Sequence, residues 1–283
     1  MYAIVRRIRS VDRPKRLGML LALAFVAFCA VCLQPKIPLG ARYHVFADQR
    51  TMVGIPRALN VLSNAIFLIV GVWGLKFLSA SRSRSAFLEK KERLPYVLFF
   101  TGVAFTGIGS AYYHLAPVDS RLPWDLLPMT LCFMSILAAT TAERISVRAG
   151  LYLLPALITF GMASVLFWQF GELRGQGDYR FYLFAQYFPA IAIAAMIILF
   201  QPRYTLTRDL FVGFVFYVLA KIVELLDAQI YGLDRIVSGH ALKHLCAGVA
   251  CYWVLRMLML RRATELPQLS SNAPEYASYG NSS

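Results

Sequence analysis

The chain has 283 residues, of which 58% are hydrophobic and only 16% are charged, and its mean hydropathy is +0.57. This composition excludes a water-soluble globular protein and is typical of an integral membrane protein. The formal net charge of +14 raises nucleic acid as a partner, but the basic residues lie mainly in the terminal segments and in certain loops. That placement favours a topology signal beside anionic lipid, and no nucleic-acid-binding domain is expected.

Eight apolar segments follow one another along the chain, and each is long enough to cross a bilayer. They cover residues 17–34, 59–78, 95–115, 123–142, 151–168, 182–200, 210–228 and 237–260. We therefore predict an all-α, polytopic membrane helical bundle. Its predicted parts are a basic cytoplasmic N-terminus (1–16), an extra transmembrane helix or uncleaved signal (17–34), a seven-helix transmembrane domain (48–260) and a disordered cytoplasmic tail (264–283).

The basic residues predict the orientation of the spans. One basic cluster precedes the first apolar segment, and a second fills the loop between residues 82 and 93. Further pairs at 144 and 148, 203 and 208, and 261 and 262 follow at alternate connections or at the end. Because cytoplasmic loops carry an excess of Lys and Arg, we expect all of these segments, and both termini, on the cytoplasmic side.

Three of the four histidines lie in two groups, Ser110-Ala-Tyr-Tyr-His114 and His240-Ala-Leu-Lys-His244. Residues four apart share one face of a helix, so each group presents its two polar side chains together. In the predicted topology, His114 ends the third span, Asp125 begins the fourth, and the second histidine group begins the eighth. All of these side chains should then lie at the same depth on the outer side of the membrane, where they could form one site.

This set of residue types is suited to a catalytic zinc site. Three neutral imidazoles can bind zinc and leave a fourth position for water, whose pKa the metal lowers towards neutrality. Asp125 could orient that water and accept its proton, while the Ser110 hydroxyl could support a ligand or an oxyanion. Two alternatives stay open: histidines that only hydrogen-bond between helices, and a haem or proton-coupled protein that uses histidine pairs as axial ligands.

At these residues the chain resembles the alkaline ceramidase family, part of a wider superfamily of seven-helix membrane hydrolases that includes the progestin and adipoQ receptors. The family pattern is Ser-x3-His on one helix, Asp at the start of the next, and His-x3-His on the last. Ser110, His114, Asp125, His240 and His244 match it in order and spacing. The run Ala-Leu-Asn-Val-Leu-Ser-Asn at 58–64 also resembles the first core helix of the family, and the similarity covers roughly residues 48–260.

The resemblance implies a ceramidase-like core of seven helices, preceded here by one extra N-terminal helix. It implies a zinc-dependent intramembrane amidase that hydrolyses the N-acyl bond of ceramide or a related N-acyl lipid to a fatty acid and a sphingoid-type base. His114, His240 and His244 correspond to the Zn²⁺ ligands, Asp125 to the residue that positions or deprotonates the water, and Ser110 to the oxyanion-stabilising position. A receptor-like or regulatory zinc protein of the same superfamily, with little turnover, is the alternative.

One departure from the family concerns calcium. Eukaryotic members have an acidic cluster before the first core helix, whereas residues 48–57 offer only Asp48 among arginines. Because calcium requires several oxygen ligands, a calcium site of that kind is not expected. This difference and the lean loops indicate a protein of a bacterial inner membrane, with its active site towards the outer side.

A few other polar residues lie in or near the predicted spans. Lys221, Glu224 and Asp227 follow helical spacing, which favours an internal ion pair, and Asp227 should lie nearest the site. Tyr113, next to His114, is in a position to touch substrate, while His44 is interpreted as a loop histidine.

Overall fold

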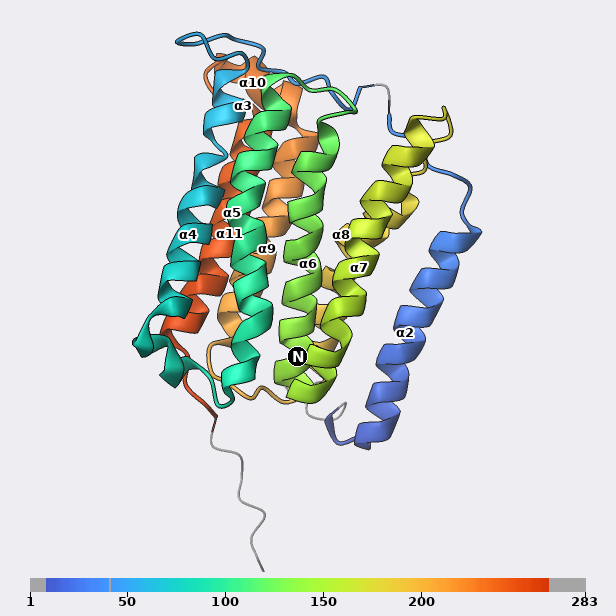
Figure 1. Cartoon of the computed structure of the whole chain (residues 1–283), viewed down its shortest axis with the longest axis vertical. Helices are drawn as coiled ribbons and strands as arrows, with labels where there is room; N and C mark the ends of the chain where they lie inside the picture. Colours follow the sequence, from blue (N-terminus) through green and yellow to red (C-terminus); the bar gives the residue numbers. More distant parts are fainter. Residues whose placement is uncertain (1–8, 41, 265–283) are drawn as a thin grey trace, which may run out of the picture.

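The structure is a computed structural model that describes residues 9–40 and 42–264. In this part of the chain the regular elements are helices, accompanied by two isolated β-bridges. The long helices stand side by side as a bundle, with α2 at its edge (Figure 1). The α-helices are α2 (Arg13–Leu33), α3 (Ala58–Leu62), α4 (Ala65–Ser79), α5 (Arg93–Leu115), α6 (Leu122–Arg144), α7 (Val147–Glu172), α8 (Arg180–Leu199), α9 (Thr207–Leu225), α10 (Asp227–Asp234) and α11 (Gly239–Leu260), and two short 3₁₀ helices are η1 (Ser81–Ala86) and η2 (Lys90–Glu92).

Among the described residues, seven helices are long and apolar enough to cross a membrane: α2, α3 with α4, α5, α6, α7, α8 and α11. The chain is therefore an integral multi-pass membrane protein. Helix α9, which the sequence counts as a further span, does not qualify because four charged residues interrupt it. Two of these, Asp209 and Glu224, form ion pairs with Arg256 and Lys243 of α11, along which α9 packs. An eighth span, and with it the division into seven core helices and one extra helix, stays a prediction.

Two predicted helices differ from the observed ones. The apolar segment 59–78 is divided into α3 and α4 at Ser63 and Asn64, where the Asn64 amide donates to the Asn60 carbonyl oxygen at 2.7 Å. Such side-chain bonds compete with the helical backbone pattern. The segment 210–228 ends early, at Leu225, and the separate short helix α10 follows it. Both changes lie at the end of the bundle that holds the histidines.

Helix α2 lies against α8, and none of its residues is buried. It is attached at both ends. Near its start, the Arg16 guanidinium donates to the Leu199 carbonyl oxygen at the end of α8 at 2.7 Å. Near its end, Arg180 at the start of α8 donates to carbonyl groups that include those of Val31 and Gln34. These contacts hold α2 alongside one wall of the bundle.

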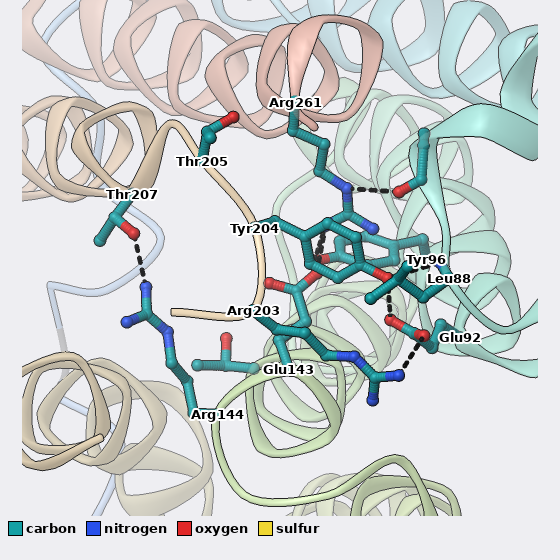
Figure 2. A network of polar contacts seen from close by, with 12 residues as sticks. Leu88, Glu92, Tyr96, Glu143, Arg144, Arg203, Tyr204, Thr205, Thr207 and Arg261 are labelled. Carbon is teal, nitrogen blue, oxygen red and sulfur yellow. Dashed lines mark hydrogen bonds and ion pairs between the residues drawn. The ribbon is translucent and has the colours of Figure 1, made fainter. Parts of the chain in front are cut away.

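A buried polar network joins several elements (Figure 2). It includes Tyr96 near the start of α5, whereas His114 lies at the other end of that helix, so the network and the histidines are at opposite ends of the bundle. Arg261, at the end of α11, forms an ion pair with Glu143 of α6, and its guanidinium lies 4.0 Å from the centre of the Tyr204 ring. The Tyr96 hydroxyl of α5 donates to Glu143 at 2.6 Å, and the Tyr204 hydroxyl donates to Glu92 at 2.6 Å. The network therefore ties α5, α6 and α11 to the loop between α8 and α9.

This network also bears on the predicted topology. Arg144, Arg203 and Arg261 come from three separate basic segments that the sequence places on one side of the membrane. All three lie together at this end of the bundle (Figure 2). The three segments thus lie at the same end of the bundle, while the side of the membrane that this end faces stays a prediction.

Replacing Arg261 by methionine is expected to lower the free energy of unfolding by about 3–5 kcal/mol, because it leaves the buried Glu143 carboxylate without its partner. Thermal unfolding in detergent should show a lower Tm. Arg262→Met, at the exposed neighbouring residue, is the matched control and should change little. Adding Glu143→Leu to Arg261→Met should restore part of the loss, and an Arg261→Met variant as stable as the parent would contradict a stabilising role for the pair.

Candidate metal centre

The three predicted histidine ligands meet at one end of the bundle. His114 lies in the last turn of α5, and His240 and His244 lie in the first two turns of α11. All three side chains are buried, and one nitrogen of each lies within 4.8 Å of the corresponding nitrogens of the other two. The structure thus brings together residues from helices that are far apart in the sequence. They form a group that could hold a metal ion.

The geometry of this group fits zinc. Two ligand atoms on one tetrahedral zinc lie about 3.3 Å apart, and the Nε2 atoms of His114 and His240 are 3.2 Å apart. The Nε2 atom of His244 is buried without a hydrogen-bond partner. A buried nitrogen without a partner is costly unless a ligand satisfies it. A metal bound by the three Nε2 atoms would satisfy it and would also account for the close approach of the other two.

Ser63 is a supporting residue that sequence reasoning did not single out. Its hydroxyl lies 2.8 Å from His244 Nδ1, so it orients the ring and leaves Nε2 for the metal, as supporting hydrogen bonds commonly do around zinc. The break between α3 and α4 places this hydroxyl beside α11. Nearby, Ser238 caps the start of α11 and donates to the Asn60 side-chain oxygen at 3.2 Å. In the sequence, the only indication of a role for Ser63 was that it lies in the run at 58–64, which resembles the first core helix of the ceramidase family.

We expect Ser63→Ala to weaken zinc affinity by about 10- to 100-fold, because supporting hydrogen bonds contribute in this range. Competition with a chromophoric chelator would measure the change. Ser79→Ala removes a hydroxyl from the exposed end of α4, where it donates to the Leu75 carbonyl oxygen, and should leave the affinity unaltered. Equal affinities in the two variants would show that Ser63 does not support the site.

Asp125 and Ser110 lie next to each other beside the histidine group. Both side chains are buried, and both line the same cavity as His240 and His244. The close contact of α5 and α6 depends on Gly109, where a Cβ atom would lie 1.9 Å from the Trp124 carbonyl oxygen. Asp125 is not one of the residues in the histidine group itself. Its position suits a residue that acts on a bound molecule rather than a metal ligand.

A strap formed by residues 43–50 covers the histidines from outside the bundle. The Phe46 ring packs against His114 and His240, with ring centres 4.7 and 4.4 Å apart, and only 6% of its surface is exposed. Asp227 holds the strap to α11, since its carboxylate accepts the backbone N–H groups of Ala47 at 2.9 Å and His240 at 2.7 Å. Sequence reasoning missed this strap because it has no helical periodicity.

Charged groups at the strap are satisfied by local partners. The Arg50 guanidinium hydrogen-bonds the buried Asp48 carboxylate, and this lowers the pKa of Asp48 below its usual value. Arg57 donates to the carbonyl oxygens of His114 at 2.8 Å and Leu115 at 2.7 Å. A cation at the last carbonyl groups of α5 complements the negative end of the helix. Arg57 also donates to the Gln49 side-chain oxygen of the strap at 3.1 Å, so it links the strap to the end of the helix that carries His114.

A cavity of about 990 Å³ extends from the histidine group down the interior of the bundle. Its walls come from α5, α6, α8, α9 and α11, and along α8 they run from Tyr182 to Ile198, almost the whole helix. Helices α8 and α9 both line it, and their backbones are not closely packed, although Lys221 of α9 lies over the Tyr187 ring of α8. Its volume is at the upper end of the range of about 300–1,000 Å³ that is usual for ligand pockets.

Lys221, Glu224 and Asp227 are the charged residues that helical spacing placed together in or near the spans. Lys221 and Glu224 form the predicted ion pair. Lys243 of α11 also pairs with Glu224, with its Nζ atom 3.1 Å from a carboxylate oxygen. Asp227 is not part of it and instead bonds backbone N–H groups, as described above. All four residues line the cavity. Asp227 also reaches the histidine group itself, through its hydrogen bond to the His240 backbone N–H.

A scan against models of known protein families found no match, and searches of curated proteins and of solved structures found none either. The resemblance to alkaline ceramidases therefore rests on the motif residues alone. What the structure adds is their convergence at the polar end of a long cavity.

Proposed function

We propose that the protein is a zinc-dependent intramembrane amidase that hydrolyses the N-acyl bond of ceramide or a related N-acyl lipid. The observation that carries this proposal is the buried group of His114, His240 and His244 at one end of a long, mostly apolar cavity. A lipid amide needs both features, since its reacting bond is polar and its chains are not. Zinc bound by the three imidazoles would polarise the amide carbonyl and lower the pKa of water.

The other residues have separable roles in this reaction. Asp125 accepts a proton from the attacking water and returns it to the departing nitrogen, so that amide and water yield a fatty acid and an amine. The Ser110 hydroxyl, which lines the same cavity as Asp125, can donate to the oxyanion that forms on the carbonyl oxygen. Phe46 excludes bulk water from the histidines. These roles follow the matched motif positions and the proximity of the side chains.

The cavity shape supports a lipid substrate that enters from the bilayer. Because α8 and α9 line the cavity without packing closely together, an acyl chain can pass between them. We propose that the histidine group faces the outer side of the membrane, because the basic segments at the opposite end of the bundle favour a cytoplasmic location for that end by the positive-inside rule. We propose a bacterial inner membrane as the location.

The test is to incubate the purified protein with a panel of N-acyl lipids and to analyse the products by mass spectrometry, with and without a chelator. We expect release of a fatty acid and an amine, loss of release with the chelator, and recovery on adding zinc. Stoichiometric zinc without release from any lipid in the panel would favour the receptor-like alternative. Release that persists after complete removal of zinc would overturn the mechanism.

A further inference from the structure

A chain of hydrogen bonds connects the outer surface to the cavity through His44, which the sequence suggested was only a loop residue. His44 Nε2 lies 2.8 Å from an Asp119 carboxylate oxygen, and His44 Nδ1 lies 2.8 Å from the Tyr113 hydroxyl. The Asp119 side chain is 46% exposed and that of His44 is 24% exposed, whereas Tyr113 is buried and lines the cavity. Exposure thus falls stepwise from solvent to the neighbour of His114.

We propose that Asp119 and His44 are positioning residues that set the direction of the Tyr113 hydroxyl hydrogen, and that Tyr113 thereby selects the polar head of the bound lipid. This inference rests on the proposed function for the identity of the ligand as a lipid. The hydrogen-bond geometry that supports it does not involve the metal centre.

The direction follows from the chemistry of the three groups. A carboxylate only accepts hydrogen bonds, so a neutral His44 carries its hydrogen on Nε2 and donates it to Asp119. The Nδ1 atom is then an acceptor, and the Tyr113 hydroxyl must donate to it. With its hydrogen used in this way, the Tyr113 oxygen presents lone pairs to the cavity. It can accept a hydrogen bond from a head-group hydroxyl or from an amide N–H.

The groups that face His44 are Tyr43 on the strap, Tyr113 on α5 and Asp119 in the loop after α5. Asp119 is the only carboxylate that contacts His44 among the described residues, so this one contact holds the ring hydrogen on Nε2. A lipid head that donates a hydrogen bond to Tyr113 should therefore bind more tightly than a head that cannot donate.

Asp119→Asn offers a way to reverse the direction of the Tyr113 hydroxyl. An asparagine amide can donate to Nε2, which places the histidine hydrogen on Nδ1 and makes the Tyr113 oxygen an acceptor. The same logic explains why an Asp-to-Asn change next to a catalytic histidine can trap the wrong tautomer. Asp119 is half-exposed and lies in a loop, so this substitution should not disturb the fold.

The experiment measures binding of two fluorescent, non-cleavable fatty sulfonamides by anisotropy on zinc-loaded protein, one with a hydroxyethyl head group and one with a methoxyethyl head group that cannot donate from its oxygen. In the parent, the hydroxyethyl ligand should bind about 2- to 10-fold more tightly, the range expected for one hydrogen bond. Asp119→Asn, His44→Phe and Tyr113→Phe should each lose this preference. Tyr112→Phe, which removes the neighbouring hydroxyl outside the cavity, is the control and should behave like the parent.

The outcomes separate this inference from the proposed function. An Asp119→Asn variant that keeps the parent's preference for the hydroxyethyl ligand, or a preference that persists in both His44→Phe and Tyr113→Phe, would overturn the relay even if the protein hydrolyses lipids. The expected binding pattern in a protein that hydrolyses none would support the relay and overturn the amidase.

Discussion

His244→Ala is expected to abolish zinc binding and lipid amide hydrolysis together. The His244 Nε2 atom is buried without a partner, and the other two imidazoles are already in contact through their Nε2 atoms. Removing one of three protein ligands leaves a two-nitrogen site, too few for the ligand sets that hold zinc in proteins. We expect the zinc content to fall from about one ion per chain to near zero. Elemental analysis and the product assay measure the two effects on the same sample.

His44→Ala is the matched control for zinc content, because it removes the one histidine outside the group. That variant should keep its zinc. A monodisperse elution profile in detergent and an unaltered Tm in the presence of zinc would confirm that the His44 variant is folded. If a His240→Ala, His244→Ala double variant still bound one zinc per chain, the metal would lie elsewhere and the assignment of the site would be wrong.

Asp125→Asn is expected to keep zinc and lose turnover by about 10²- to 10⁴-fold, the usual contribution of a positioned general base. Asparagine has almost the same shape as aspartate, but it cannot accept a proton from water. The structure supports this separation because Asp125 lines the cavity together with Ser110 and is not part of the histidine group. The loss should appear in kcat, with a small change in KM.

Asp234→Asn is the control for this prediction. Asp234 is an exposed carboxylate at the end of α10, at the same end of the bundle as the histidines, and it does not line the cavity. Its replacement should leave both zinc and turnover unchanged. Loss of zinc from Asp125→Asn would instead indicate that Asp125 supports the metal ligands, and unaltered turnover would exclude it as the base.

Local patterns in the sequence were enough to predict the helices and the histidine group. Apolar length indicates a membrane helix, and spacing of four residues indicates a shared face, so His240 and His244 could be paired without any tertiary information. The positive-inside rule then placed His114 at the same end as that pair, which the structure confirms. The charged residues of α9 can also be read from the sequence. Composition alone does not show that Asp209 and Glu224 form ion pairs with residues of α11.

Other features depended on contacts between segments that carry no regular pattern. Phe46 and His44 lie on an irregular strap, and Ser63 lies at a break that the apolar run of its segment conceals. Sequence periodicity describes which side of a helix a residue occupies, but it does not describe which residue of another helix or loop faces it. The sequence by itself therefore determined the class of protein and the residues that could bind a metal. Only the tertiary structure decided which side chains orient those residues, cover them and connect them to solvent, because such contacts arise from packing between distant parts of the chain.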